Sequence, residues 1–322
     1  GTSHQIVNSD LEGCVNIVKW LSYVPVRRGA RTPLYLQALD PVTRSPTFVP
    51  ASKNALYDPR VLAVGEENIY SAEVLNAKAA PGVPLTGIFD KNSFMEVMGG
   101  WAKGVVTGRA RLGGIPVGVV CVDTRTTEHT IPADPAGADT KETVITRAGQ
   151  VWYPESSYKT AQAIFDMAAE DLPLVMLANF RGFSGDSKAM HEMVLKFGSY
   201  IVDALRGIQK PIIVYLPPHA TLRGGAWVVV DETINYEWME MYADPTARGG
   251  VLEPEGIVDV KFRREQILAE MHRVDPKMQK LNQSLKTASD VDAANIKAEI
   301  KQREKILFPT YLQIATYFAD LH

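Results

Sequence analysis

The chain has 322 residues, of which 46% are hydrophobic and 22% are charged, and its formal net charge is −3 at pH 7. This composition is typical of a globular protein with a substantial core, and the small negative charge gives no sign of nucleic-acid binding. Two distant cysteines, Cys14 and Cys121, predict a reducing compartment, and apolar runs no longer than a strand predict no membrane span.

The first hundred residues predict two helices and a connector. Ser9 and Glu12 have the spacing of a capping box, so a helix is predicted from Ser9 to Val24. Its apolar residues recur on one face: Leu11, Cys14, Val15, Val18 and Leu21. Residues 26–60 are rich in proline and turn residues and are predicted to form a long connector over the surface.

A second, shorter helix is predicted from Ser93. Its apolar residues have the spacing of one helical face: Phe94, Val97, Met98 and Trp101. From Val105 onward, buried-strand patterns alternate with amphipathic patterns, which predicts an α/β domain. The strands are "GIPVGVVCVD", "LPLVMLAN" and "KPIIVYLPP", and the helices are "SSYKTAQAIFDMAAED" and "SKAMHEMVLKFGSYIVDALRG". The charge-rich C-terminal part, with stretches such as "KAEIKQREK", predicts a helical hairpin with solvated charged faces.

Two strands run into loops that carry candidate chemistry. "VMLANFRGFSGD" leads from an apolar run to Arg181, and "PIIVYLPPHATLRGGAWVVVD" leads to Gly224 and Gly225. Ligands of open α/β sheets bind beyond the carboxyl ends of strands. The two segments are therefore predicted to be two halves of one site.

Each half has a functional and a structural interpretation. A helix that starts at the glycine pair would present backbone N–H groups without intrahelical partners, and glycine allows an oxyanion to come close. The guanidinium of Arg181 can hold a carboxylate through two parallel hydrogen bonds, which lysine cannot match. Taken alone, the glycine pair is better explained as a tight turn, and a lone arginine as the partner of a structural acid.

Several common catalytic motifs are missing from the sequence. "GFSGD", which ends at Asp186, departs from the G-x-S-x-G nucleophile motif at its last position, and the 6 histidines lack zinc-site spacing. Neither a Walker loop nor a G-x-G-x-x-G motif occurs. This inventory suits a reaction whose substrates bring their own base.

The chain resembles the carboxyltransferase domain of eukaryotic-type multidomain acetyl-CoA carboxylases, except over residues 27–85. The matching stretches include "DLEGCVNIVKWLSYVP", "GRARLGGIPVGVVCVDTRT", "AGQVWYPESSYKTAQAI", "LANFRGFSGD", "LRGGAWVVVDETIN" and "ARGGVLEPEGIVDVKFRRE". The resemblance implies a crotonase-like (ClpP/crotonase) α/β fold, a superhelix of ββα units, here with a C-terminal helical hairpin. Carboxyltransferases that act on propionyl-CoA share this fold, but the "RGFSG" and "LEPEG" motifs are more similar to the acetyl-CoA enzymes.

The resemblance also implies a reaction and its partners. The carboxyl group would pass from carboxybiotin to acetyl-CoA, giving malonyl-CoA for fatty acid biosynthesis, and the freed biotin would remove the acetyl proton. Biotin would arrive on a carrier domain outside this chain, while ATP and Mg would serve only a separate biotin carboxylase domain. The carboxyltransferase region would be a homodimer in the cytoplasm or a plastid, without nucleic acid, a membrane span or a targeting segment in this chain.

Site residues follow from the matched motifs. Arg181 matches the arginine that reads the carboxyl group, and Gly225, beside Gly224, matches a glycine whose N–H serves the active site. Substrate- or biotin-binding positions are implied at Phe180, Gly182, Phe183, Ala226, Glu253 and Gly256, and no metal ligand is implied. Phe180 stands where the family often has tryptophan, and Asp186 where it usually has glycine. These two differences affect the expected inhibitor preference more than the expected reaction.

The resemblance divides the chain at about residue 100. Residues 1–100 would be the end of a first carboxyltransferase unit plus a connector, and residues 101–322 a second crotonase-like unit with a helical extension. The family's first-unit glycine-rich loop has no counterpart here, so we expect a central fragment that is inactive alone. Two alternatives remain: a non-catalytic dimerisation scaffold, and another acyl-CoA-processing enzyme of this fold, which would need a side-chain acid or base.

Overall fold

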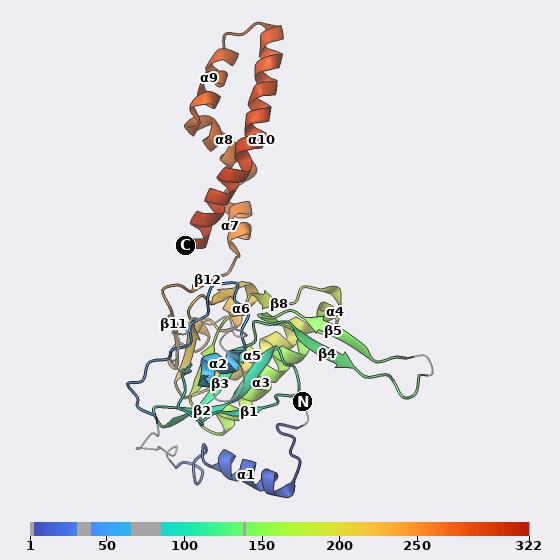
Figure 1. The fold of residues 1–322 in the computed structure, drawn as a ribbon, viewed down its shortest axis with the longest axis vertical. Helices are drawn as coiled ribbons and strands as arrows, with labels where there is room; N and C mark the ends of the chain where they lie inside the picture. The colour runs from blue at the N-terminus through green and yellow to red at the C-terminus, as the bar shows by residue number, and fades with distance from the viewer. Residues whose placement is uncertain (1–2, 31–39, 66–84, 138–139, 322) are drawn as a thin grey trace. The chain divides into compact units, whose positions relative to one another are not determined.

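The chain folds into two compact units, which we describe separately. A computed structural model describes residues 3–30, 40–65, 85–137 and 140–321. Unit 1 spans Gly1–Gly249 and unit 2 spans Gly250–His322 (Figure 1). Within the described part of the chain, no helix is both long and apolar enough to cross a membrane.

A six-stranded mixed sheet forms the centre of unit 1, in the order β1-β2-β3-β7-β9-β11. The strands are β1 (Met95–Val97), β2 (Val105–Leu112), β3 (Ile115–Val122), β7 (Leu174–Leu177), β9 (Ile212–Leu216) and β11 (Met239–Ala243). The pairs β1–β2 and β2–β3 are antiparallel, whereas β3, β7, β9 and β11 are parallel. Parallel strands need crossover connections, and the first two crossovers contain α3 (Pro154–Ala169) and α5 (Val194–Gly207).

Shorter elements complete unit 1. They are α1 (Asp10–Leu21), α2 (Pro59–Val64), β4 (Thr127–Ile131), β5 (Thr143–Arg147), β6 (Val151–Trp152), β8 (Gly182–Phe183), α4 (Ser187–His191), β10 (Thr221–Arg223), α6 (Gly224–Val229), η1 (Glu232–Asn235) and β12 (Arg248–Gly250). β4 and β5 form an antiparallel hairpin, β6 pairs with β8 in parallel, and β10 pairs with β12. The β6–β8 and β10 elements carry the segments of the predicted site.

Apolar side chains cover both faces of the sheet, because successive residues of a strand point in opposite directions. In β3, Val120 belongs to the cluster that includes Ile164 of α3 and Ile201 of α5. Its neighbour Val119 belongs to the other cluster, which includes residues of α2. The sheet is therefore the middle layer, with α3 and α5 on one face and α2 on the other (Figure 1).

The region predicted as a surface connector takes part in the core instead. Phe48, Tyr57, Val61 and Leu62 are each at most 4% exposed and pack against the sheet. These buried residues do not recur with the period of a helix or a strand along the sequence. Only six residues form α2, and irregular turns precede it. Within the predicted connector, the expected surface position was therefore wrong for Phe48 and for residues 57–59, whereas residues 52–54 are exposed and the absence of a sustained period was predicted correctly.

The predicted elements from Val105 onward are confirmed, with one break. The three predicted strands appear as β3, β7 and β9, and the two helices as α3 and the α4–α5 pair. Met193 adopts a left-handed conformation, with φ 64°, and interrupts the second helix between α4 and α5. At the N-terminal end, Ser9 caps α1 as predicted, accepting a hydrogen bond from the backbone N–H of Glu12 at 3.3 Å.

The short helix predicted from Ser93 is wrong. β1 occupies Met95–Val97 and pairs with β2, where Met95 lies opposite Arg109. Met98 then turns the chain with a φ of 57°. A three-residue strand followed by a turn gives the same apolar spacing as one helical turn, so periodicity could not distinguish them.

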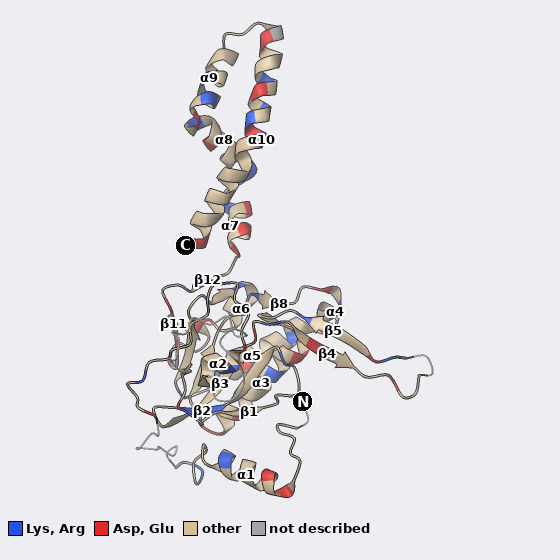
Figure 2. Ribbon diagram, viewed as in Figure 1, with Lys and Arg blue, Asp and Glu red and all other residues tan. Residues whose placement is uncertain are grey.

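Unit 2 is the helical hairpin predicted for the C-terminal part. It consists of α7 (Pro254–Lys261), α8 (Arg264–Val274), α9 (Pro276–Leu285) and α10 (Asp290–Leu321). Val258, Ile267, Met271 and Ala319 form its small apolar core. Residues of both charge signs lie along α10 (Figure 2). Lys277 of α9 pairs with Glu299 of α10 at 2.7 Å.

Asp275 links three helices of unit 2, and we predict that it makes α9 sensitive to acid. Its carboxylate accepts hydrogen bonds from the Met278 N–H at 2.9 Å and from Arg303 of α10 at 2.9 and 2.7 Å. The bonds from Arg303 lower the pKa of Asp275 from 3.8 to about 2. A pKa lowered by folding adds stability above the unfolded-state pKa, and this stability is lost as the pH falls from about 4 to 2.

The measurement is hydrogen exchange, followed as protection factors of the α9 amides. We expect protection to fall between pH 5 and pH 2, and Asp275→Asn to have low protection at both pH values. Since the asparagine cannot titrate, the variant should show a much smaller pH dependence than the unsubstituted protein. An equal pH dependence in both proteins would assign the effect to other carboxylates.

Candidate functional site

The two segments predicted to form one site lie side by side in unit 1. We call Asn179–Asp186 the arginine segment and Thr221–Ala226 the glycine segment. The Arg223 N–H donates a hydrogen bond to the Phe180 carbonyl at 2.9 Å, and the Thr221 N–H donates to Oδ1 of Asn179 at 2.9 Å. The segments follow β7 and β9, which are adjacent parallel strands. The prediction that they meet beyond the carboxyl ends of these strands is therefore confirmed.

The backbone of the arginine segment is fixed on both sides of Arg181. The Arg181 N–H donates to the Gln150 carbonyl at 2.8 Å, and the Ser184 N–H donates to the Trp152 carbonyl at 2.8 Å. Between them, β8 pairs in parallel with β6. The Arg181 side chain is exposed. Arg181 is therefore an exposed residue on a rigid stretch of backbone.

Gly182 owes its identity to backbone conformation. Its φ is 146°, a value that residues with a side chain rarely adopt, and no atom lies within 4 Å of the position of an added Cβ. The backbone therefore requires glycine although the surrounding space is open. Gly182 is itself buried, so it sets the backbone path beside Arg181 and offers no exposed surface of its own.

Aromatic rings support the arginine segment from the inside. The Trp152 ring stacks on Phe180 at a centroid distance of 3.8 Å and on Phe183 at 5.1 Å. Phe180 is 0% exposed, and Phe183 is half-buried. This geometry gives Phe180 a packing role, and a direct contact of Phe180 with a substrate stays a prediction.

The glycine segment turns sharply into α6. Gly224 has a φ of 57°, which glycine adopts without strain, and Gly225 is exposed. A Cβ on Gly225 would lie 3.0 Å from Cδ2 of Phe183, so this glycine also makes room for that ring. Ala226 is fully buried behind it. The helix start at the glycine pair is confirmed, but α6 has only six residues. A helix this short has a weak macrodipole. The glycine pair would therefore serve a ligand mainly by letting it approach the backbone closely.

Asp186 has a structural use that the sequence did not indicate. It is the N-cap of α4, accepting hydrogen bonds from the Ser184 hydroxyl and from the Ala189 N–H. The hydrogen bond from Ser184 is the main cause that lowers the pKa of Asp186 below its ordinary value. Because its pKa is lowered, the Asp186 carboxylate binds a proton weakly, which makes it a poor general base.

Glu253 and Gly256 belong to unit 2. Glu253 is the N-cap residue of α7, and Gly256 lies in the first turn of that helix. Pro254 between them occupies the first helical position, which suits its fixed φ. Their expected role at a biotin entrance stays a prediction.

Sequence reasoning missed the side chain that joins the two segments. Asn179 is 5% exposed, and its Oδ1 accepts hydrogen bonds from the Thr221 N–H and from Nε2 of Gln150, the latter at 2.6 Å. Its Nδ2 donates to the hydroxyl oxygen of Tyr57 at 3.3 Å. The available signal was a polar residue at the end of an apolar run, where a buried amide needs several partners.

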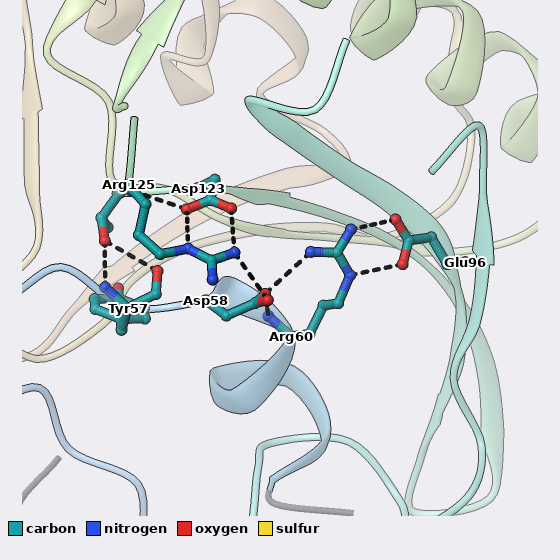
Figure 3. A network of polar contacts seen from close by, with 7 residues as sticks. Tyr57, Asp58, Arg60, Glu96, Asp123 and Arg125 are labelled. Carbon is teal, nitrogen blue, oxygen red and sulfur yellow. Dashed lines mark hydrogen bonds and ion pairs between the residues drawn. The ribbon is translucent and has the colours of Figure 1, made fainter. Parts of the chain in front are cut away.

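Tyr57 is itself held by Thr124 and lies next to a network of charged residues (Figure 3). Its N–H donates to the Thr124 hydroxyl at 2.7 Å, and that hydroxyl donates back to the Tyr57 carbonyl at 3.0 Å. The residue after Tyr57, Asp58, pairs with Arg125 at 2.9 Å and with Arg60 at 3.1 Å. The remaining pairs of the network are Arg125 with Asp123 at 2.8 Å and Arg60 with Glu96 at 2.5 Å.

Comparison with known proteins identifies the family. The family model described as "Carboxyl transferase domain" matches residues 1–322. The chain belongs to the carboxyl transferase domain family. It is 49% identical over 329 residues to an acetyl-CoA carboxylase of Dictyostelium discoideum and 50% identical over 325 residues to that of Schizosaccharomyces pombe. Both alignments include 100% of this chain but only 14% of the relative. The predicted resemblance to eukaryotic acetyl-CoA carboxylases is confirmed.

Solved structures of transcarboxylase 12S share the fold. One, with methylmalonyl-coenzyme A and methylmalonic acid bound, has a TM-score of 0.59 and 21% identity over 81% of this chain and 42% of that one. Another, with hydrolyzed methylmalonyl-coenzyme A bound, has a TM-score of 0.57 and 20% identity over 94% of this chain and 46% of that one. The crotonase-like fold predicted for this carboxyl transferase domain is thereby confirmed.

Proposed function

We propose that this carboxyl transferase domain moves a carboxyl group from carboxybiotin to acetyl-CoA, giving malonyl-CoA for fatty acid biosynthesis. One observation carries the proposal. Exposed Arg181 and exposed Gly225 lie on two segments that are hydrogen-bonded to each other beyond the carboxyl ends of adjacent parallel strands. The names of the relatives support the choice of acetyl-CoA.

The two segments suit recognition of a carboxyl group. A guanidinium binds a planar carboxylate through two parallel hydrogen bonds, so Arg181 would hold and orient it. The exposed backbone of Gly225, which has no side chain to shield it, would donate an N–H to an oxygen that gains negative charge. Gly224 would provide the turn that presents this N–H.

The residues present fit a biotin ring beside Arg181. Arg181 is exposed, and a Cβ on the buried Gly182 next to it would meet no atom within 4 Å, which would leave room for a flat ureido ring. Bound carboxybiotin would supply both the carboxyl group and, after its release, the nitrogen that accepts the acetyl proton. The protein then needs no base of its own, which agrees with the engagement of Asp186 as a helix cap. Phe183 and Ala226 would form the wall of this site.

We also propose how this domain works with the other domains of a larger protein. Biotin would come on a carrier domain outside this chain, ATP and Mg would be used by a separate biotin carboxylase domain, and the carboxyltransferase region would act as a homodimer. The 14% share of its relatives that the chain spans leaves room for such domains. Residues 101–322 would form one crotonase-like unit, with Glu253 and Gly256 at the biotin entrance, and residues 1–100 would close a preceding unit. A cytosolic or plastid location fits the two free cysteines.

The test is decarboxylation of malonyl-CoA by the full-length protein with free biotin as acceptor. We expect malonyl-CoA and biotin to give acetyl-CoA and carboxybiotin in equal amounts, with CO2 released as carboxybiotin breaks down, and malonyl-CoA to be preferred over methylmalonyl-CoA. Preference for methylmalonyl-CoA would overturn the acetyl-CoA assignment. A folded dimer without turnover of either thioester would favour the non-catalytic scaffold.

A further inference from the structure

We propose that Asn179 is a positioning residue, whose buried carboxamide fixes the arginine segment and the glycine segment in one relative placement. The proposal rests on the proposed function and extends it to a residue that does not touch the substrate. A carboxylate held by Arg181 and an oxygen held by Gly225 belong to one small reacting group. Arg181 and Gly225 must therefore stay at a fixed distance from each other, because misplacement by about 1 Å can cost about 10²-fold in rate.

The contacts of Asn179 connect to both segments. Oδ1 accepts from the Thr221 N–H at the start of β10, which leads directly to the glycine pair. The same atom accepts from Nε2 of Gln150, whose own carbonyl holds the Arg181 N–H at 2.8 Å. Gln150 adopts a φ of 62°, which is uncommon for a residue with a long side chain. One oxygen atom thus restrains the residue that holds Arg181 and the strand that leads to Gly225.

The orientation of the Asn179 amide follows from its partners. A backbone N–H can only donate, so the atom that faces Thr221 must be the oxygen. Nδ2 then faces the hydroxyl oxygen of Tyr57, which accepts its hydrogen bond at 3.3 Å. Burial raises the pKa of Tyr57, which keeps this hydroxyl protonated and uncharged. The Thr221 N–H therefore sets which way the amide points, and the Tyr57 hydroxyl accepts the hydrogen bond from its other end.

Tyr57 can serve as an anchor because its backbone is fixed. Thr124, at the end of β3, exchanges two hydrogen bonds with the Tyr57 backbone, and the adjacent Asp58 lies between Arg60 and Arg125 (Figure 3). Asp58 is only 4% exposed, so its pairs with the two arginines are poorly screened by solvent. The anchor belongs to the opposite layer of the sheet from α3 and α5. Residues 57–60 are thereby coupled to the placement of both segments.

The test compares three variants in the full-length protein by malonyl-CoA decarboxylation. Asn179→Leu keeps the size of the side chain but removes the shared acceptor, and we expect kcat/KM to fall at least tenfold. Asn179→Asp keeps both acceptor contacts and can accept from the Tyr57 hydroxyl, so we expect it to stay within threefold of the unsubstituted protein. The control is Asn235→Leu, because Asn235 also makes two hydrogen bonds, to the carbonyls of Leu205 and Ile208 at 2.9 and 2.8 Å. It should lower Tm and leave kcat/KM within twofold.

A double substitution separates positioning from general stability. If Asn179 acts by placing Arg181, then adding Asn179→Leu to Arg181→Lys should lower kcat/KM by less than about threefold. Independent effects would instead multiply. A combined loss equal to the product of the single losses, or Asn179→Leu within twofold of the unsubstituted protein, would overturn the proposal. Asn179→Ser, which is too short to bridge the segments, replaces the leucine variant with the same expectations if that variant does not fold.

The outcomes also distinguish this proposal from the proposed function. Without malonyl-CoA turnover by the unsubstituted protein, the proposed function itself fails. With turnover that depends on Arg181 and not on Asn179, the function stands and only the positioning role of Asn179 is lost.

Discussion

Arg181→Lys in the full-length protein is expected to lower kcat/KM for malonyl-CoA decarboxylation roughly 30-fold, with little change in Tm. The Arg181 N–H is held by the Gln150 carbonyl and the residue is exposed, so the backbone of the segment should keep its place when lysine replaces arginine. Lysine keeps the charge but loses the two-pronged geometry. A hydrogen bond to a charged group contributes about 2 kcal/mol, and about 1.4 kcal/mol corresponds to a tenfold change in rate.

Two controls make this result specific. Arg206→Lys changes an exposed arginine of α5 in the same way, and it should leave kcat/KM within twofold. The affinity of Arg181→Lys for acetyl-CoA should stay unchanged, because acetyl-CoA lacks the carboxylate that Arg181 would bind. Unchanged decarboxylation by Arg181→Lys would remove this residue from the site, and a parallel loss of acetyl-CoA affinity would indicate a different role.

The placement of the two segments could be predicted because it depends on a general property of α/β sheets. Short apolar runs located β7 and β9, and the rule that ligands bind beyond carboxyl ends of parallel strands brought Arg181 and Gly225 together. Neither step needed long-range contacts. The identities of the glycines also pointed to sharp turns, and the φ values of Gly182 and Gly224 agree with that interpretation.

The contacts that hold the segments together could not be predicted in this way. Asn179 meets Tyr57 across 122 positions of sequence and Thr221 across 42, and no local period records such a meeting. Tyr57 lies in a stretch dominated by turn residues, where apolar side chains reach the core one at a time. Which distant polar groups pair depends on the complete fold. The sequence alone therefore indicated only Asn179, as a polar residue at the end of an apolar run.

Asp186 illustrates a related limit. As a departure from the family pattern, it suggested a changed pocket wall. In the fold it begins α4 by accepting the Ala189 N–H at 2.8 Å, which is the function of an aspartate at a helix N-cap. The spacing from Asp186 to Ala189 was visible in the sequence, but α4 merges there with the pattern of α5. Two residues, Glu192 and the left-handed Met193, separate the two helices.

Gly225→Val is expected to lower kcat/KM for malonyl-CoA decarboxylation at least 100-fold and to lower Tm as well. A side chain here would cover the backbone N–H, and the loss of one oxyanion donor typically costs about 10²–10³ in kcat. A Cβ at this position would lie 3.0 Å from the Phe183 ring. Overpacking of this kind typically costs about 1–3 kcal/mol, so stability and activity should fall together.

Gly198 of α5 separates these two effects, because it touches the opposite edge of the same ring. A Cβ on Gly198 would lie 2.7 Å from Cε1 of Phe183, so Gly198→Ala also displaces the ring without altering the glycine segment. We expect Gly198→Ala to lower Tm with less than a tenfold loss of kcat/KM, measured alongside Gly225→Val in the full-length protein. Equal losses of activity in the two variants would mean that Gly225 only accommodates Phe183. A loss confined to Gly225→Val would instead support an N–H that must stay uncovered for the substrate.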